Sequence, residues 1–435
     1  MRGKIIVKGL IVMGIWMLAY SLSTCSIVIS AEKVKLTYWT HWGQNPRWNQ
    51  WYSDTAKKFS IINPDVDLTV EVVNIPYEGY VPKYLSAFIG VKGAPDMFNG
   101  MTHQWAGKHS FADPMPEDFA QYLEDNLVPF LLNIGVWGGK RYGVPLESGN
   151  FQMLYINVDM FKEAGLDPNR PIKTYDQFLE YAKKLTKDID GDGKLDQWGY
   201  GIRYKGHPLG IADKFVTPFL HAWGARMISI EERKASGYVN SENAVEALRF
   251  YGDLVNKYHV ASLVVPNPAG AFGQKLAAMI FRESWYGGWL VENAPDIEYK
   301  IYPIPIAKLA PGATNMFPWT DMVYKNAPTK NKKWAWEYLK FINSPAMVLD
   351  HCQYQRLFPP PFKSTMLTEY AKGQFCYEAM IAMVDRPPAP TYYIPEAHEL
   401  AYELGEAILD VIYRRATSED ALNTAAADMD EILKE

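Results

Sequence analysis

Apolar positions along the first hundred residues of the chain follow two spacings, one typical of strands and one typical of amphipathic helices. Residues 35–39 alternate as a strand does, an amphipathic helix follows as far as Ile62, and a second strand is expected at 67–73. A helix around 81–89 then leads to a short buried strand at 95–98. This strand–helix–strand order predicts an α/β fold with a parallel sheet and crossover helices.

The remaining chain continues this mixture of strands and helices, and its last third reads as helical. At 435 residues, the chain exceeds a typical domain by roughly two- to threefold, so two lobes are expected. The further elements that the pattern predicts are strands at 153–156, 299–306 and 322–325, a short apolar segment at 275–281, and helices at 158–164, 175–185, 241–258, 330–342, 399–413 and 418–433.

The first thirty-one residues have the pattern of an export signal. Arg2, Lys4 and Lys8 precede an apolar stretch at 9–22, and no later segment approaches transmembrane length. Two processing routes remain open: ordinary signal cleavage after residue 31, or lipid attachment at Cys25 within a sequence similar to a bacterial lipobox. Either route exports the protein, and the second would anchor it to a membrane. The alternative to both is a retained N-terminal membrane helix.

The composition argues against nucleic acid as a partner and favours a ligand that contacts aromatic rings. The net charge is −5 and basic residues are dispersed, so nothing indicates nucleic-acid binding. The chain carries 14 Trp, 28 Tyr and 19 Phe, more than core filling ordinarily needs, so some rings are expected to face a ligand. Cys352 and Cys376 are open to two interpretations, a disulfide in an oxidising compartment or two buried thiols.

An acidic loop at 188–199 places carboxylates at alternate positions around Gly193. In calcium-binding loops, such side chains converge on one hard cation where a glycine permits positive φ. Position twelve is Gly199 rather than the usual bidentate Glu, so we expect a structural calcium rather than a switch, with a solvated acidic turn as the alternative. The expected ligands are the side chains of Asp188, Asp190, Asp192 and Asp196 and the backbone carbonyl of Lys194.

Several short motifs, taken in order, resemble one family over nearly the whole mature chain. This family is the extracellular solute-binding proteins that deliver sugars to ABC importers, of which the maltose-binding protein is the most familiar. The motifs are APDM at 94–97, YGVP at 142–145, LYIN at 154–157, FKEAG at 161–165, AFGQKLAAM at 271–279 followed by SW at 284–285, PIP at 303–305, KKWAWEYL at 332–339 and SEDAL at 418–422.

The resemblance implies a two-lobed periplasmic-binding-protein fold of type II, with a hinge of several chain crossings and a ligand cleft between the lobes. Residues 32–146 and about 312–355 would form the N-terminal lobe, and 147–311 and about 356–435 the C-terminal lobe. The protein would be an extracytoplasmic monomer that binds a carbohydrate and passes it to a membrane permease.

The same resemblance supplies candidate ligand contacts on both sides of the cleft. Sugars need planar rings for their C–H faces and polar groups for their hydroxyls. Two positions depart from the family pattern: Arg282, where a small residue is usual, and the segment 318–321, where a glycine-rich turn is usual. The candidates are His41, Trp42, Gln44, Thr102, His103, Glu147 and Asn150 near the first lobe, and Trp223, Trp285, Trp319, Asp321 and Tyr393 around the second lobe and the crossings.

Two alternatives to a sugar receptor stay open at this point. Aromatic residues with paired carboxylates also describe glycosidases, although the sequence offers no recognisable catalytic acid pair. The same fold could instead bind a polyol or a sugar phosphate through basic residues. The candidates for such contacts are Arg203, Lys205, Arg282 and Arg356.

Overall fold

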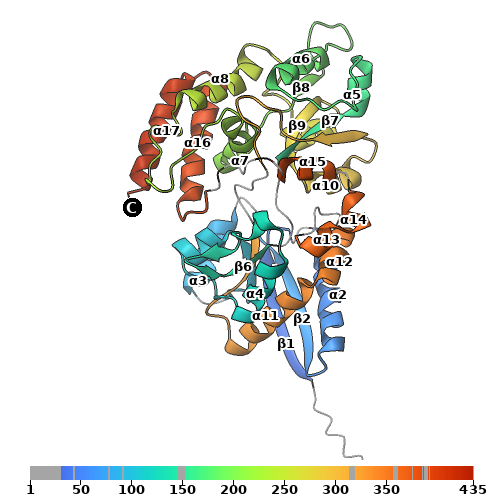
Figure 1. Cartoon of the computed structure of the whole chain (residues 1–435), viewed down its shortest axis with the longest axis vertical. Coiled ribbons are helices and arrows are strands. Elements are labelled where there is room, and N and C mark those ends of the chain that lie inside the picture. The colour runs from blue at the N-terminus through green and yellow to red at the C-terminus, as the bar shows by residue number, and fades with distance from the viewer. Residues whose placement is uncertain are drawn as a thin grey trace, which may run out of the picture.

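The structure is a computed structural model in which two lobes are stacked along the long axis of the molecule (Figure 1). The export signal predicted at 1–31, including Cys25, lies outside the described residues except for residue 31. The described residues are 31–42, 45–76, 79–90, 93–145, 152–312, 319–355, 361–374, 376–384, 386, 390 and 392–434.

The first lobe is built on a five-stranded mixed sheet. β1 runs parallel to β2 and to β3, as the strand–helix–strand pattern predicts. β11 runs antiparallel to β3 and β6, which corrects the expectation of a purely parallel sheet. This strand enters from the second lobe, so no crossover helix fixes its direction. The sheet order is β2 (Val66–Asn74), β1 (Glu32–Thr40), β3 (Met97–Gly100), β11 (Thr320–Val323) and β6 (Gly143–Pro145).

Helices cover this sheet, and α2 begins at a side-chain cap. The side chain of Asn45 accepts a hydrogen bond from the backbone N–H of Arg47, and Pro46 occupies the first turn of α2, where no N–H is needed. Trp48, Trp51 and further apolar residues of α2 then pack into the core. The elements of this lobe outside the sheet are α2 (Pro46–Ile62), α3 (Tyr80–Gly90), the π-helix η2 (His103–Lys108), α4 (Glu117–Asn126), η3 (Pro129–Leu131), β4 (Val136–Trp137), β5 (Lys140–Arg141), α11 (Thr329–Ile342) and α12 (Pro345–Gln355).

The second lobe has a four-stranded sheet in which antiparallel pairs dominate. β7 is antiparallel to both β10 and β9, and only β8 runs parallel to β9, so the parallel arrangement predicted for the first hundred residues does not extend to this lobe. Every residue of β7 and β9 is buried, which explains why these strands read as continuous apolar runs. The order is β10 (Tyr299–Tyr302), β7 (Gln152–Asn157), β9 (Ala277–Glu283) and β8 (Trp198–Tyr200).

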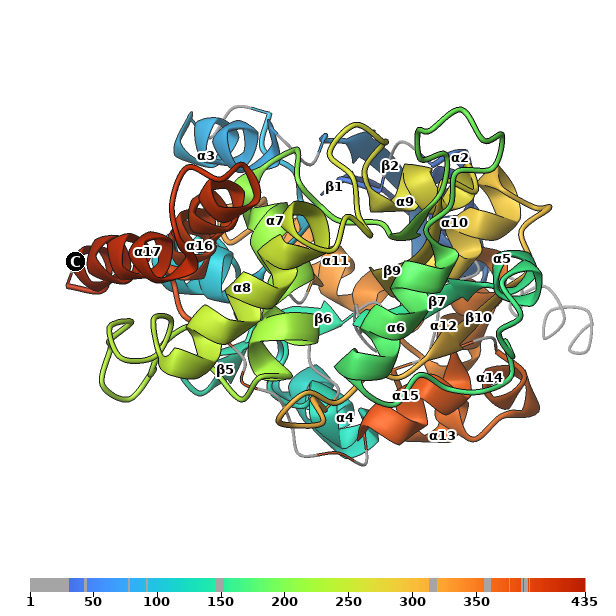
Figure 2. The same ribbon diagram turned by 90° about the horizontal axis from the view of Figure 1, so that it is seen from above.

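Helices form one side of the second lobe, where α16 and α17 lie beside α7 and α8 (Figures 1 and 2). The backbones of α16 and α7 touch at Gly405, because a Cβ there would lie 2.2 Å from the carbonyl oxygen of Pro208. The helices of this lobe and of the C-terminal connection are α5 (Val158–Glu163), α6 (Tyr175–Leu185), α7 (Pro208–Phe215), η4 (Val216–His221), α8 (Glu242–Asn256), α9 (Pro268–Gly273), α10 (Tyr286–Asn293), α13 (Lys363–Met366), α14 (Glu369–Lys372), α15 (Tyr377–Val384), α16 (Ala397–Ile412) and α17 (Ser418–Ile432).

The chain between α12 and α15 connects the lobes. The backbone N–H of Val128 donates to the carbonyl of Pro361 at 3.0 Å, and Leu127 pairs with Phe362, so this stretch starts on the first lobe. α15 then packs against β10 of the second lobe. Cys352 and Cys376 are both buried thiols. Within the described ranges, no helix has the length and apolar content that crossing a membrane requires.

Candidate ligand-binding site between the lobes

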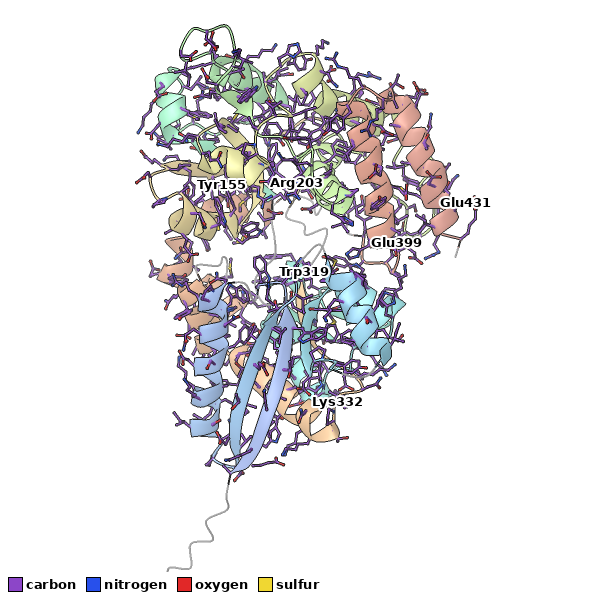
Figure 3. All side chains as sticks on the ribbon, turned by 180° about the vertical axis from the view of Figure 1, so that it is seen from behind. Tyr155, Arg203, Trp319, Lys332, Glu399 and Glu431 are labelled. Carbon is purple, nitrogen blue, oxygen red and sulfur yellow. The ribbon has the colours of Figure 1, made fainter. Side chains whose placement is uncertain are left out.

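A row of four rings crosses the face that the first lobe turns toward the second, and we call it the aromatic floor. It consists of Trp42, His41, Trp319 and Tyr80. The centroid of His41 lies 4.5 Å from that of Trp42 and 4.1 Å from that of Trp319, and Trp319 lies 5.3 Å from Tyr80. Figure 3 shows Trp319 at the upper edge of the first lobe, below the second lobe. The four rings therefore contact one another in a continuous row.

The ends of the sheet strands position this floor. His41 and Trp42 directly follow β1, and Trp319 directly precedes β11, while Tyr80 begins α3. Ligands of α/β sheets commonly bind where strands end at such an edge. Trp42 is fixed from behind by Trp48 of α2, whose ring is stacked at 5.5 Å and 11°. Loss of hydration lowers the pKa of His41 to about 3, so its imidazole is neutral at physiological pH.

One end of the floor meets the second lobe through tryptophan. Trp42 and Trp285, which directly precedes α10, lie edge to face, with centroids 6.0 Å apart and ring planes at 70°. Arg47 of α2 also forms an ion pair with Glu292 of α10, with Nη1 3.2 Å from Oε1. We call these four residues the tryptophan flank. It places aromatic faces from both lobes side by side.

The other end of the floor meets α16 through titratable side chains. The Tyr80 hydroxyl and His398 Nε2 are 3.1 Å apart, and Lys108 of η2 forms an ion pair with Glu399. His103 stacks against Tyr393, with centroids 6.1 Å apart at 12°. Figure 3 shows Glu399 at the end of its helix beside the first lobe. The histidine flank comprises Tyr80, His103, Lys108, Tyr393, His398 and Glu399.

Burial keeps both histidines of this flank neutral. It lowers the pKa of His103 to about 4. Burial, and then the nearby histidines and Lys108, lower the pKa of His398 to about 3. A protonated imidazole would have to lose water and approach another cation here, which is unfavourable on both counts. The contact between the lobes at this flank therefore favours the unprotonated rings.

Two successive tyrosines of the last chain crossing contact opposite lobes. The Tyr392 hydroxyl accepts a hydrogen bond from the backbone N–H of Met227 at 2.8 Å and lies 3.0 Å from His221 Nε2, both in the second lobe. The next side chain, Tyr393, stacks on His103 of the first lobe. The two neighbouring side chains therefore reach opposite lobes. The crossing thus connects a fixed point in one lobe to the site.

Of the predicted residues in the first lobe, Thr102 is hydrogen-bonded to the sheet and Asp321 lies within it. Thr102 is buried and shares a 2.9 Å hydrogen bond with Thr320. Asp321 was expected in a loop, but it lies in β11 and is fully buried, so that expectation is wrong. Its Oδ1 accepts hydrogen bonds from the Tyr38 hydroxyl at 2.6 Å and from Asn99 at 2.9 Å. Burial raises the pKa of Asp321 to about 7 despite these two donors.

Trp223 packs within the second lobe rather than with the floor or the flanks. Its ring is 8% exposed and lies 4.7 Å from Tyr175 and 5.0 Å from Phe250. Of the other predicted contacts, Gln44, Glu147 and Asn150 lie outside the described residues. The structure thus brings His41, Trp42, His103, Trp285, Trp319 and Tyr393 together around one interlobe site.

Comparison with known proteins agrees with this two-lobed geometry. The family model for bacterial extracellular solute-binding proteins matches residues 47–348, well over half of the chain. The chain belongs to this family. The family is one of binding proteins outside the cytoplasm, as the export-like start of the sequence predicts.

Individual relatives of this solute-binding protein have different named ligands. The arabinooligosaccharide-binding protein of Bacillus subtilis (strain 168) is 24% identical over 67% of this chain and 66% of its own length. The sn-glycerol-3-phosphate-binding periplasmic protein of Escherichia coli (strain K12) is 30% identical, but over only 30% of this chain and 31% of its own. The maltose/maltodextrin-binding domain MalE from Bdellovibrio bacteriovorus, solved with maltotriose, has a TM-score of 0.77 at 19% identity and covers 92% of this chain and 100% of that chain.

Sequence reasoning missed Tyr80, Gln104 and His398 of this solute-binding protein. The Tyr80 hydroxyl donates to Gln104 Oε1 at 3.1 Å and also contacts His398, which is 318 residues away in sequence. Tyr80 and His398 lie on predicted helices or at their ends, where a ring most often packs in the core. No local spacing marks them as partners, because only the approach of the two lobes brings them together.

The acidic loop of the second lobe has the turn expected of a cation loop. One carboxylate oxygen from each of Asp188, Asp190 and Asp196 lies within 4.8 Å of the others. Gly191 and Gly193 have φ values of +79° and +86°, and both donate backbone N–H bonds to Asp188, at 2.7 and 2.8 Å. This set of hard oxygen donors suits calcium.

Two further residues of this loop differ from a complete calcium-binding loop. Asp192 is outside the close group and is 3.3 Å from the ammonium of Lys194. At position twelve, a Cβ on Gly199 would lie 2.1 Å from the carbonyl oxygen of Ala182. A bidentate Glu therefore cannot occupy this position without moving α6 away from β8.

Proposed function

We propose that this solute-binding protein captures a carbohydrate, specifically an oligosaccharide, between its lobes and delivers it to the permease of an ABC importer. The observation that carries the proposal is the aromatic floor of the first lobe opposite Trp285 of the second. Sugar rings present weakly apolar C–H faces, which pack on aromatic planes, and a long row of rings can serve several sugar units in succession. The oligosaccharide ligands named for two of the relatives support this choice.

Capture would follow from contact with both lobes at once. A ligand resting on Trp42 and Trp319 while touching Trp285 gains its full set of contacts only when the lobes are together. It therefore selects the closed arrangement from an equilibrium of open and closed forms. The permease would then recognise the closed protein and receive the sugar.

The described basic residues near the second lobe favour a neutral ligand over a sugar phosphate. Arg282 is 3.4 Å from Glu283, so its charge is compensated. Lys205 lies over the ring of Tyr204 and donates to the carbonyl of Val265 at 3.3 Å. Arg203, which is labelled in Figure 3, packs against the backbone at Gly206. Arg356, the fourth candidate, lies outside the described residues.

A ligand screen by thermal unfolding tests this function. The purified mature chain is heated with neutral arabino- and malto-oligosaccharides, with uronides and with glycerol 3-phosphate. A neutral oligosaccharide at about 100 times its Kd should stabilise the fold by about 2.7 kcal/mol, which raises Tm by a few degrees. Stabilisation by the phosphate or the uronides alone would contradict the choice of ligand, and no stabilisation by any compound would contradict sugar capture.

Product analysis separates a receptor from a secreted carbohydrate enzyme. A sugar that shifts Tm is incubated with the protein, the protein is then denatured, and the released sugar is analysed by chromatography. The expected result is intact sugar in a 1:1 ratio to protein. If shorter products accumulate beyond one equivalent of protein, the protein is a glycosidase and the receptor hypothesis is wrong.

We also propose that the acidic loop holds a structural calcium ion on Asp188, Asp190 and Asp196, with Asp192 and the carbonyl of Lys194 completing the set. Unfolding is followed with calcium and then with EDTA. Calcium is expected to raise Tm, and Asp190→Asn should remove most of that increase while sugar affinity stays unchanged. The matched control is Asp118→Asn, an exposed carboxylate of the other lobe. An equal Tm in calcium and EDTA would leave the loop as a solvated turn.

We further propose that the protein is exported by its N-terminal segment, acts as a monomer and contacts a membrane only through the permease or through a lipid on Cys25. Mass spectrometry of protein from the native cell separates the two processing routes. A chain that begins at residue 32 supports signal cleavage, and a diacylglyceryl group on Cys25 supports the lipid anchor. Light scattering during size-exclusion chromatography checks the monomer.

A further inference from the structure

Arg282 is a buried cation directly behind Trp285, and sugar capture as proposed above gives it no role. It lies on β9, a strand buried along its whole length, and is 5% exposed. The guanidinium carbon lies over two rings, 4.9 Å from the centroid of Trp285 and 5.5 Å from that of Tyr286. Cation–π contacts of this kind are strongest where water is excluded.

Arg282 pairs with the buried carboxylate of Glu283, which a second buried cation, Lys214, holds in turn. Arg282 Nε is 3.4 Å from Glu283 Oε2, and the same carboxylate accepts a hydrogen bond from Lys214, which also pairs with Asp213. Lys214 and Glu283 are 5% and 7% exposed. Although burial raises the pKa of Glu283, Arg282 and Lys214 lower it to about 2, so the carboxylate stays charged. Arg282 therefore has a buried anionic partner in addition to the two rings.

Burying these charged groups costs desolvation free energy, so the presence of an arginine at this position requires an explanation. A buried ion pair is often no more stabilising than apolar residues of the same volume. A small or apolar residue before Trp285 would satisfy packing alone. A guanidinium offers something else: a rigid planar group that stacks on an aromatic face and binds a carboxylate at the same time. A guanidinium held in this way can fix the plane of the Trp285 ring relative to β9.

The ring that Arg282 supports is the one that meets the other lobe. Trp285 has the guanidinium over one face, and it contacts Trp42 edge to face at 6.0 Å. The covered face is closed to a ligand, so only the opposite face and the edge of the indole can serve the interlobe site. Rotation of Trp285 about its side-chain bonds would lose both the cation and Trp42.

We propose that Arg282, held by Glu283 and Lys214, is a positioning residue that sets the orientation of Trp285 before any ligand arrives. Pre-organisation of this kind lowers the entropic cost of binding. The proposal rests on the function proposed above only for its effect on sugar affinity. The orientation of the ring is testable without a ligand.

The test uses protein labelled with 5-fluorotryptophan, in which the ¹⁹F resonance of Trp285 is assigned by its absence in Trp285→Phe. Arg282→Lys keeps the charge but loses the planar group. In the absence of sugar, we expect this variant to shift and broaden the Trp285 resonance, while that of Trp223, which packs inside the second lobe, stays sharp. Its affinity for a sugar found in the thermal screen should fall about tenfold. Arg226→Lys, at an exposed cation–π pair with Tyr238 in the same lobe, is the matched control.

A second variant covers the case in which Arg282→Lys fails to fold. Arg282→Leu combined with Glu283→Gln removes the cation and its carboxylate together, so no isolated charge stays buried. It should broaden the Trp285 resonance in the same way. A sharp resonance at the wild-type position in a folded variant overturns the proposal. If no sugar binds the wild-type protein, the proposed function fails while the resonance comparison still decides the role of Arg282.

Discussion

The two flanks of the interlobe site join the same pair of lobes with different chemistry. Each contains one ion pair of similar exposure: Arg47 and Glu292 are 38% and 35% exposed in one, and Lys108 and Glu399 are 35% and 44% exposed in the other. Such partly exposed pairs contribute only about 0–1 kcal/mol. The charges therefore do not distinguish the flanks. The difference lies in the rings, which are indoles in one flank and imidazoles with tyrosines in the other.

Because of this difference, the two flanks respond differently to a ligand and to acid when the lobes close. Indole has no proton to gain near neutral pH, so the contact between Trp42 and Trp285 responds to a ligand face but not to acid. The buried imidazoles of His103 and His398 must stay neutral for the lobes to meet, so their flank responds to protons as well. We therefore expect the tryptophan flank to dominate affinity and the histidine flank to set its pH dependence.

The largest expected effect comes from removing the indoles. Trp285→Ala or Trp42→Ala should each weaken sugar binding by roughly 30- to 1000-fold, because a buried tryptophan contact is typically worth about 2–4 kcal/mol. Isothermal titration calorimetry at pH 7.5 measures this loss. Trp223→Phe is the control, since its ring packs inside the second lobe and should affect Tm more than affinity. A comparable loss of affinity in Trp223→Phe would place a ligand contact away from the flank.

The next largest effect is expected from acid. Burial holds the pKa of His103 at about 4 and that of His398 at about 3, below the usual value near 6.5 that separated lobes would restore. Protons thus bind the open form more readily once the pH falls below 6.5, and closure weakens until about pH 4 for His103 and about pH 3 for His398. At pH 5.5, each histidine should reduce affinity about tenfold, and the two together about 100-fold. Calorimetry between pH 5 and 8 measures the slope.

Two variants show whether this slope belongs to the histidine flank. His103→Asn should lower the number of protons released on sugar binding at pH 5.5 by about one, whereas His259→Asn changes an exposed histidine and should leave it unchanged. His351, buried inside the first lobe with a pKa of about 3, should affect acid unfolding rather than sugar binding. A slope that survives in His103→Asn combined with His398→Asn would contradict the assignment.

The sequence predicted the bounds of several helices closely. It predicted the residues of the tryptophan flank better than those of the histidine flank. α6 occupies residues 175–185 as its apolar spacing predicts, and α17 ends one residue before the predicted limit. Trp42 and Trp285 were identifiable because both lie at the ends of strands, where a ring seldom serves the core. β3 begins at Met97, two residues later than expected, since Pro95 and Asp96 precede the pairing with β1.

Only some residues of the histidine flank could be predicted from the sequence, for a physical reason. His103 and Tyr393 follow from resemblance to the family, but Tyr80 and His398 become partners only when α3 and α16 approach across the two lobes. The antiparallel direction of β11 and β9 could not be predicted for the same reason, because both pair with strands from distant parts of the chain. The sequence pattern predicts that β11 begins at residue 322 and leaves Asp321 in the preceding loop, whereas in the structure Tyr38 and Asn99 supply the donors that make its burial tolerable.

Replacing Asp321 is expected to change sugar affinity less than the variants above do. The effect of Asp321 on stability also has the opposite pH dependence, since stability is lost as the pH rises, whereas binding at the histidine flank is lost in acid. Its pKa is raised from the ordinary value near 4 to about 7 by burial, so the folded protein binds a proton that the unfolded chain has released. Stability from this group is present below pH 4 and is lost as pH rises through 7. Asp321→Asn should remove that loss, changing unfolding free energy by roughly 1–3 kcal/mol between pH 5 and 8, with less than tenfold change in affinity. Asp118→Asn, at an exposed ion pair in the same lobe, is the control for chemical denaturation at both pH values.

The smallest effects are expected from the two ion pairs, and they test whether the flanks differ only in their rings. Glu292→Gln and Glu399→Gln should each weaken binding by less than about fivefold, because partly exposed pairs contribute about 0–1 kcal/mol. Both losses should shrink in 0.5 M salt, where the Debye length falls to roughly 4 Å. Calorimetry at low and high salt checks this. If Glu399→Gln alone had a large effect that also changed the pH slope, the carboxylate would be part of the proton response, because Lys108 would then face His398 without its anionic partner.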